Sequence, residues 1–111
     1  MVRPRKCRHI RVTPASRFYK PQGMPLRGLR IVTIKDEELE ALSLADAQGL
    51  DQESAAALMN ISRSTFSRIL AAARKSVATA LIEGAALKIE GGDYHHVADA
   101  KERGGGAEDN S

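Results

Sequence analysis

The sequence has little cysteine, few aromatic residues and no long apolar run. A single cysteine, Cys7, among 111 residues excludes an intrachain disulfide framework. No stretch approaches the roughly 20 apolar residues of a membrane-spanning helix, and no N-terminal run resembles a signal peptide. There is no Trp, and the 42% hydrophobic content is rich in Ala and Leu, a balance that favours helices over sheets. We therefore expect one small, mainly α-helical domain in the cytoplasm, without a membrane partner.

Acidic residues are missing from two long stretches. Residues 1–30 contain nine Lys or Arg, residues 54–82 contain four, and neither stretch contains Asp or Glu. Between them, residues 35–53 contain seven acids and one Lys. The net charge of +3 therefore conceals a segregation of charge, and basic blocks of this kind attract phosphate backbones.

Proline occurs only in the first 25 residues, so long helices are not expected there. Short strands are expected at residues 9–12 and 29–34 instead, although the second of these also fits the entry to a helix. A third strand is expected at residues 86–90, with Leu87 and Ile89 pointing inward. We expect this third strand to pair with one of the N-terminal strands.

The chain divides by composition into three parts. Residues 1–32 are expected to be a basic, Pro-rich segment that packs on the core, anchored by Phe18 and Tyr19. Residues 33–92 are expected to form the main domain. Residues 93–111, rich in Gly and charge, are expected to be a flexible tail.

A first helix is expected to begin at Thr33, which forms a capping-box pattern with Asp36, and to end at Gly49. The helix dipole favours acidic residues in its first turn, where we expect them to form an exposed surface. The expected buried stripe is Leu39, Leu42 and Ala45, and the expected exposed acids are Asp36, Glu37, Glu38 and Glu40.

Two further helices are expected on either side of a turn at Asn60, a residue type that tolerates the left-handed conformation. Asp51 is the expected cap of the second helix and Ser62 that of the third. The third helix is expected to run from Arg63 to Glu83, before Gly84. The expected apolar positions are Ala55, Leu58 and Met59 in the second helix and Phe66, Ile69, Leu70, Ala73, Val77 and Leu81 in the third.

Two helices joined by so tight a turn indicate a helix-turn-helix, whose second helix enters the major groove of DNA. Small Ala56 lies where the helices must cross closely, and Ile61, Phe66 and Ile69 are placed to hold the recognition helix. Polar residues dominate its other face. The residues expected to contact phosphate are Gln52, Ser62, Arg74 and Lys75, and those expected to reach base edges or the flanking backbone are Arg63, Ser64, Thr65, Ser67 and Arg68.

The N-terminal segment carries Arg3, Arg5 and Lys6 close together. One interpretation is a basic arm that lies in the minor groove beside the helix-turn-helix. The other is a segment that folds onto the acidic first helix of the same chain. The sequence favours neither over the other.

Neither metal binding nor catalysis is expected. Cys7, His9, His95 and His96 match no known closed zinc site in their spacing. The sequence shows no phosphate-binding loop and no nucleophile with a paired base. We therefore expect a protein that is not an enzyme and holds no metal or cofactor.

The segment "LDQESAAALMNISRSTFSRILAAARKSV" at residues 50–77 resembles the region-four helix-turn-helix of sigma-70 factors. Together with "RPRKCR", "ELEALSLAD" and "ALKIEGG", it makes the chain similar to a family of small, uncharacterised prokaryotic proteins predicted to bind DNA. The resemblance implies double-stranded DNA as partner and a possible contact with RNA polymerase. Some relatives carry a further domain similar to the nitrogenase cofactor-binding fold, which this sequence does not show.

The sequence thus predicts a three-helix, sigma region-four-like helix-turn-helix, related to winged helices, with short extended segments at both ends. The expected function is sequence-specific DNA binding in transcription regulation, with a homodimer as the default state. Two alternatives remain: a module that docks on RNA polymerase or another regulator, and a non-specific nucleic-acid binder that uses its basic arm.

Overall fold

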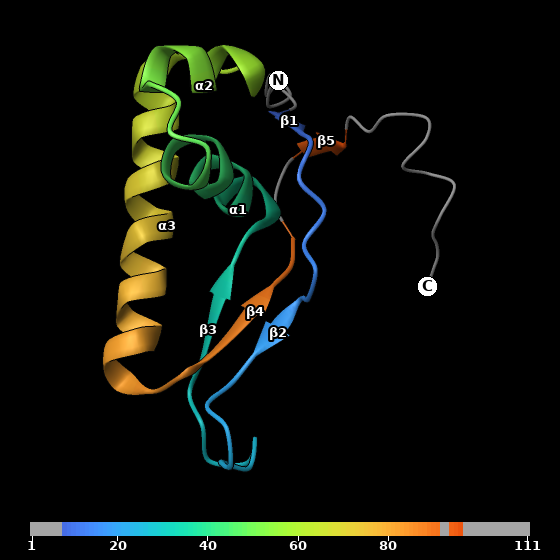
Figure 1. Cartoon of the computed structure of the whole chain (residues 1–111), viewed down its shortest axis with the longest axis vertical. Helices are drawn as coiled ribbons and strands as arrows, with labels where there is room; N and C mark the ends of the chain where they lie inside the picture. Colours follow the sequence, from blue (N-terminus) through green and yellow to red (C-terminus); the bar gives the residue numbers. More distant parts are fainter. Residues whose placement is uncertain (1–7, 92–93, 97–111) are drawn as a thin grey trace, which may run out of the picture.

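The structure is a computed structural model that describes residues 8–91 and 94–96. Within these residues it forms three α-helices, one π-helical segment and five short strands (Figure 1). Three helices flanked by extended segments are therefore confirmed, and the strands join into two small sheets. In chain order the elements are β1 (Arg8–Ile10), β2 (Phe18–Tyr19), β3 (Ile31–Ile34), α1 (Asp36–Leu42), η1 (Ser43–Ala47), α2 (Gln52–Leu58), α3 (Arg63–Glu83), β4 (Ala86–Ile89) and β5 (Tyr94–His96).

The core lies where α1, η1 and α2 pack against the first half of α3. Phe66 and Met59 are fully buried in it. Small side chains at Ala41, Ala55 and Ala56 are also buried, and they let the helices approach closely. The expected role of Ala56 at the helix crossing is confirmed. No helix in the described residues is long and apolar enough to span a membrane.

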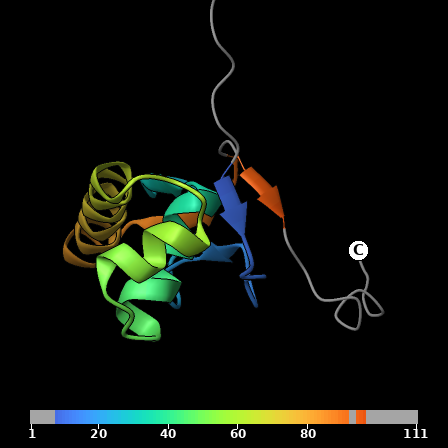
Figure 2. The same ribbon diagram turned by 90° about the horizontal axis from the view of Figure 1, so that it is seen from above.

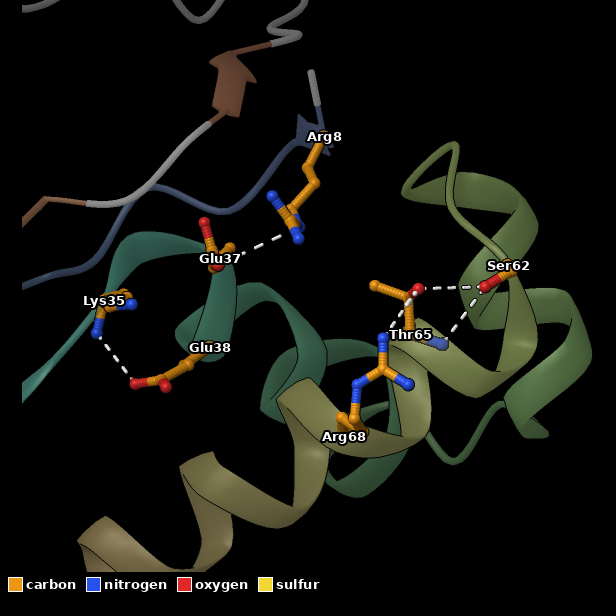
Figure 3. Close-up of polar contacts among 7 residues, drawn as sticks. All are labelled: Arg8, Lys35, Glu37, Glu38, Ser62, Thr65 and Arg68. Carbon is orange, nitrogen blue, oxygen red and sulfur yellow. Dashed lines mark hydrogen bonds and ion pairs between the residues drawn. The ribbon is translucent and has the colours of Figure 1, made fainter. Parts of the chain in front are cut away.

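Helix α1 begins later than the sequence predicted. Thr33 belongs to β3, where it is the register partner of Lys88, so a helix start at Thr33 is wrong. Lys35 precedes the first helical residue, and its backbone N–H donates to the Glu38 carboxylate at 3.0 Å (Figure 3). Glu38 therefore satisfies one of the free N–H groups at this helix end.

The acidic face of α1 is buried, which overturns the exposed surface expected for it. Asp36 and Glu37 are each 5% exposed and Glu40 is 1% exposed. Buried positions 37, 40, 41 and 44 keep helical spacing, but two of the four are carboxylates. The expected apolar stripe at Leu39, Leu42 and Ala45 is only half-buried.

Residues 8–17 cover this acidic face and supply its partners. The Arg17 guanidinium donates to Asp36 at 2.9 Å, and Arg8 Nε lies 3.8 Å from Glu37 (Figure 3). One oxygen of Glu40 accepts the backbone N–H groups of Arg11 and Val12 at 3.0 and 2.8 Å. Folding of the basic segment onto the first helix is therefore confirmed for its described part, while Arg3, Arg5 and Lys6 lie outside the described residues.

The turns around α2 and α3 follow the sequence prediction. Asp51 accepts the Ser54 N–H at 2.7 Å, Asn60 adopts φ 60°, and Ser62 accepts the Thr65 N–H at 3.1 Å. Gly84, with φ 70°, ends α3 directly after Glu83. Two expected core positions are wrong: Leu58 is exposed, and Leu81 is 73% exposed while its neighbour Ala80 is buried.

A three-stranded sheet closes the far end of the molecule (Figure 1). Strand β4 lies in the middle, parallel to β3 and antiparallel to β2, so the expected pairing of residues 86–90 with N-terminal strands is confirmed. Of the two side chains expected inward, Ile89 is buried and Leu87 half-buried. Phe18 and Tyr19 are exposed, so main-chain pairing, rather than their rings, anchors β2.

The second sheet pairs β1 with β5 in parallel, with Arg8 opposite Tyr94. Strand β5 falls within residues 93–111, which the sequence assigned to a tail. Strand β1 is held by its pairing with β5 and by the His9 N–H, which donates to the Met59 carbonyl at 3.0 Å. Strand β1 is thus fixed beside the end of α2 (Figure 2).

Candidate nucleic-acid interface

An open groove runs along the exposed face of α3, next to the start of α2. It brings together five of the residues predicted to contact DNA. Since positions 64, 67, 68 and 71 follow helical spacing, they share one face of α3. The groove is lined by Gln52, Arg63, Ser64, Ser67, Arg68 and Ala71.

The turn at Asn60 holds α2 and α3 in this arrangement. The N–H of Asn60 donates to the Ala57 carbonyl, and that of Ile61 donates to the Ala56 carbonyl, each at 3.1 Å. Buried Met59 and Phe66 pack on the opposite side of the two helices. The polar face of α3 is therefore held outward by a rigid core, as a recognition surface requires.

Ser62 and Thr65 support this face rather than line the groove. The Ser62 hydroxyl accepts the Thr65 N–H and lies 2.9 Å from the Thr65 hydroxyl. The Thr65 hydroxyl in turn accepts a long 3.4 Å hydrogen bond from the Arg68 guanidinium (Figure 3). Through these contacts Ser62 and Thr65 help to orient the Arg68 guanidinium, a role that the sequence did not reveal.

Arg74, predicted to meet phosphate, is held by a carboxylate of the same chain. Its guanidinium donates to both oxygens of Asp46 in η1, at 3.1 and 2.8 Å. Hydrogen bonding from Arg74 lowers the pKa of Asp46, and the same bond raises the pKa of Arg74. Lys75 is exposed and carries no ion pair within the part of the chain that the structure describes.

Positive charge dominates the groove. Arg63 and Arg68 both line it, and α3 contains no acid before Glu83. Two acids, Asp51 and Glu53, flank Gln52 along the chain. The pKa of Asp51 is lowered by the Ser54 backbone N–H, by the Ser54 hydroxyl and by the charge of Arg63. A polyanion that enters the groove therefore meets two arginines, two serines and the amide of Gln52.

Two members of this surface were missed as site residues. Ala71 lies in the groove, where its small side chain permits close approach of a ligand. Asp46 binds the Arg74 guanidinium although it lies 28 positions earlier in the chain. Residue spacing in the sequence does not predict a contact over that separation. In the described residues, no three His, Cys, Asp or Glu side chains are grouped to hold a metal ion, and Cys7 lies outside them.

Comparison with known proteins identifies relatives without a defined activity. A UPF0251 protein of Rhodospirillum rubrum is 56% identical over 92 residues, which cover 83% of this chain and 64% of that protein. A UPF0251 protein of Desulforudis audaxviator is 49% identical over 98 residues, covering 88% and 64%. One from Thermoanaerobacter pseudethanolicus is 47% identical over 104 residues, covering 94% and 87%.

The chain thus spans about 64% of the length of the first two relatives. No solved structure matches it. Residues 1–97 match the family described as "Protein of unknown function DUF134". With nearly the whole domain matched, and with relatives about half identical to it, this chain belongs to that family.

Proposed function

We propose that the protein binds double-stranded DNA in a sequence-specific manner and regulates transcription, with α3 inserted in the major groove. The observation that carries the proposal is the groove itself. It gathers Gln52, Arg63, Ser64, Ser67 and Arg68 on one outward face. These side chains offer the donors and hydroxyls that read base edges and phosphates.

The arrangement of α2 and α3 supports this proposal. A short helix, a tight turn with Asn60 at positive φ and a longer helix with an exposed polar face are the parts of a helix-turn-helix of the sigma region-four kind. Arg63 and Arg68 can each present two donors to a guanine edge. Gln52, at the start of α2, is placed for the phosphates that flank the groove.

The protein-docking alternative draws on a different surface. Leu81 and Ile82, near the end of α3, are 73% and 85% exposed. Exposed apolar side chains side by side can mark a protein contact. They lie more than a dozen residues along α3 from Arg68, so DNA reading and docking use separable residues.

Selection of bound sequences from random duplex DNA tests the proposal directly. We expect wild type to enrich one motif, and Arg63→Ala/Arg68→Ala to lose that enrichment with at least a tenfold drop in affinity for the motif, since each guanine contact contributes about 1–3 kcal/mol. The matched control is Arg27→Ala/Arg30→Ala, which removes the same charge from the loop between β2 and β3. Loss of enrichment in both variants would indicate general electrostatics, and no enrichment by wild type would refute base reading.

Asp46→Asn is expected to raise the affinity for random duplex DNA several-fold. The substitution removes the carboxylate whose two oxygens accept from Nε and Nη2 of the Arg74 guanidinium and frees that cation for phosphate. Fluorescence anisotropy at several salt concentrations measures the change, and the slope of log affinity against log salt should steepen by about 0.9 for one added phosphate contact. In an Arg74→Ala background the same substitution should have little effect; an equal gain there would point to the lost negative charge alone.

A further inference from the structure

A small pocket lies between the N-terminal segment, η1 and the end of α2. It measures about 220 Å³, and the described residues that line it are all different from those that line the groove along α3. Pockets for drug-sized molecules measure about 300–1,000 Å³. This pocket is therefore suited to a smaller molecule, and the charges in its lining indicate which kind.

Glu40 brings a buried negative charge to the pocket. The residue is 1% exposed, and its Oε1 atom accepts the backbone N–H groups of Arg11 and Val12 at 3.0 and 2.8 Å. Within residues 8–91 and 94–96, the other carboxylate oxygen, Oε2, accepts no hydrogen bond, and Glu40 forms no ion pair. A buried carboxylate without a cation is costly, so Oε2 is suited to a positively charged donor that enters the pocket.

Arg11 brings a positive charge to the same pocket. Its Nη1 atom donates to the Leu58 carbonyl at 3.3 Å, and in the described part of the chain its guanidinium has no carboxylate partner. Although Arg11 and Glu40 both line the pocket, their side chains form no salt bridge with each other. The remaining N–H groups of a guanidinium can bind a carboxylate through two parallel hydrogen bonds.

The π-helical segment adds neutral polar groups. Ser43 is the first residue of η1, and the Gln48 N–H donates to its carbonyl at 2.8 Å. This wide turn also brings the Gln48 side-chain amide to 3.1 Å from the Ser43 hydroxyl. Single π-helical turns occur frequently at functional sites, and this one places a hydroxyl and an amide in the lining beside the two charges.

Two leucines give the pocket an apolar wall. Leu44 is 2% exposed, and Leu58, the last residue of α2, is 36% exposed. A ligand that contacts them needs a short hydrocarbon part. A metal ion does not suit this lining, because Glu40 is its one acid among the described residues and the Arg11 guanidinium repels a cation that lacks a negative group.

We propose that this pocket binds a small α-amino acid in its zwitterionic form, with the ammonium group on Glu40 Oε2 and the carboxylate on the Arg11 guanidinium. The side chain of the amino acid lies against Leu44 and Leu58. A simple amine leaves Arg11 without a partner, and a simple carboxylate leaves Glu40 uncompensated, so a molecule with both charges satisfies both residues. This site goes beyond DNA binding and does not depend on it.

The test is calorimetric titration of the full chain with L-alanine, L-serine, L-valine and L-leucine. We expect at least one of them to bind with a Kd below about 1 mM. The analogues that lack one charge of the best-bound amino acid (ethylamine and propionate for L-alanine) should bind at least about tenfold more weakly, since each loses a charge-assisted hydrogen bond.

Two variants separate the roles of the charged residues. Glu40→Gln removes the partner of the ammonium group but keeps an oxygen for the two backbone N–H groups, and it should weaken binding about tenfold or more. Arg11→Gln keeps its backbone N–H and should weaken binding several-fold. The matched controls, Glu38→Gln and Arg27→Gln, remove the same charges outside the pocket and should keep the wild-type affinity. Thermal unfolding checks each fold, and Arg11→Gln decides the question if Glu40→Gln does not fold.

Amide chemical shifts locate the bound amino acid. During the titration the N–H signals of Val12, Ser43 and Gln48 should move, whereas those of Ser64 and Ser67 in the α3 groove should not. Movement confined to the groove would overturn the proposal, because the carboxylate would then be bound by the arginines of α3. Failure of all four amino acids to bind, equal affinity for either single-charge analogue, wild-type affinity in a folded Glu40→Gln or Arg11→Gln protein, or an equal loss in the controls would overturn it too. None of these results depends on whether the protein selects a DNA motif, so the two proposals fail separately.

Discussion

Phe66→Ala is expected to lower the free energy of unfolding by about 3–5 kcal/mol, the usual cost of truncating a buried aromatic ring. Phe66 is fully buried at the point where α3 meets α1, η1 and α2. It is the one aromatic side chain of this core cluster within the described residues, and the alanines around it are too small to fill the space that the ring would leave. Small domains have about 5–15 kcal/mol of stability in total, so the loss is a large part of the whole.

Urea unfolding followed by circular dichroism measures this loss. Leu81→Ala is the matched control, because Leu81 lies on the same helix but is 73% exposed; its truncation should change the free energy of unfolding by no more than about 0.5 kcal/mol. Equal stability of the two variants would contradict the core described above. A destabilised Phe66→Ala protein should also bind DNA less well, since the face of α3 is set by the packing beneath it.

Glu40→Leu is expected to destabilise the protein through the N-terminal segment rather than through the helices. One oxygen of Glu40 accepts the N–H groups of both Arg11 and Val12, and a leucine leaves both donors without an acceptor. A fully buried donor left unpaired costs about 1–3 kcal/mol. These two donors are only partly buried, so we expect a loss toward the lower end of that range for each. Glu40→Gln, which keeps a carbonyl oxygen in nearly the same place, should lose less.

Hydrogen exchange locates the effect of this substitution. In Glu40→Leu the amides of Arg11 and Val12 should exchange much faster than in wild type, ahead of those in α3. Glu38→Leu is the control, because among the described residues Glu38 accepts only the Lys35 N–H, in a solvent-exposed hydrogen bond. Unchanged protection of Arg11 and Val12 would show that the Glu40 carboxylate does not hold this segment.

The parts of the fold that the sequence predicted well are those set by local chemistry. Asp51 and Ser62 cap helices with their own side chains, and Asn60 and Gly84 adopt backbone conformations that few other residues accept. Each acts on neighbours within about four residues, so spacing alone reveals it. The bounds of α3 were accordingly correct to the residue.

The buried acids of α1 escaped prediction for the opposite reason. Their partners lie 19 to 29 positions earlier in the chain, and two of those partners are backbone N–H groups, which carry no sequence signature. Without knowledge of that contact, three acids in the first turn of a helix, followed by a fourth at Glu40, indicate a solvated face. The apolar residues of α1 therefore could not show which face of this helix is buried.

The candidate site shows the same division. Arg63, Ser64, Ser67 and Arg68 were predicted together because they share one face of one helix. The support of Arg68 by Thr65 and the engagement of Arg74 by Asp46 depend on rotamers and on packing between helices. Helical periodicity identifies a face, but it does not show which side chains on that face are already engaged.

The parallel pairing of β3 with β4 has a consequence for how the molecule folds and opens. Ile34 lies opposite Ile89, so the ladder closes a loop that contains α1, η1, α2 and α3. Closing a loop of about 50 residues is entropically costly, and such non-local contacts slow folding relative to helices that meet locally. We therefore infer that the helices assemble first and that the sheet forms last. Once formed, it ties the two ends of the helical unit together, so that fraying at either end of this unit must first break the same four-residue ladder.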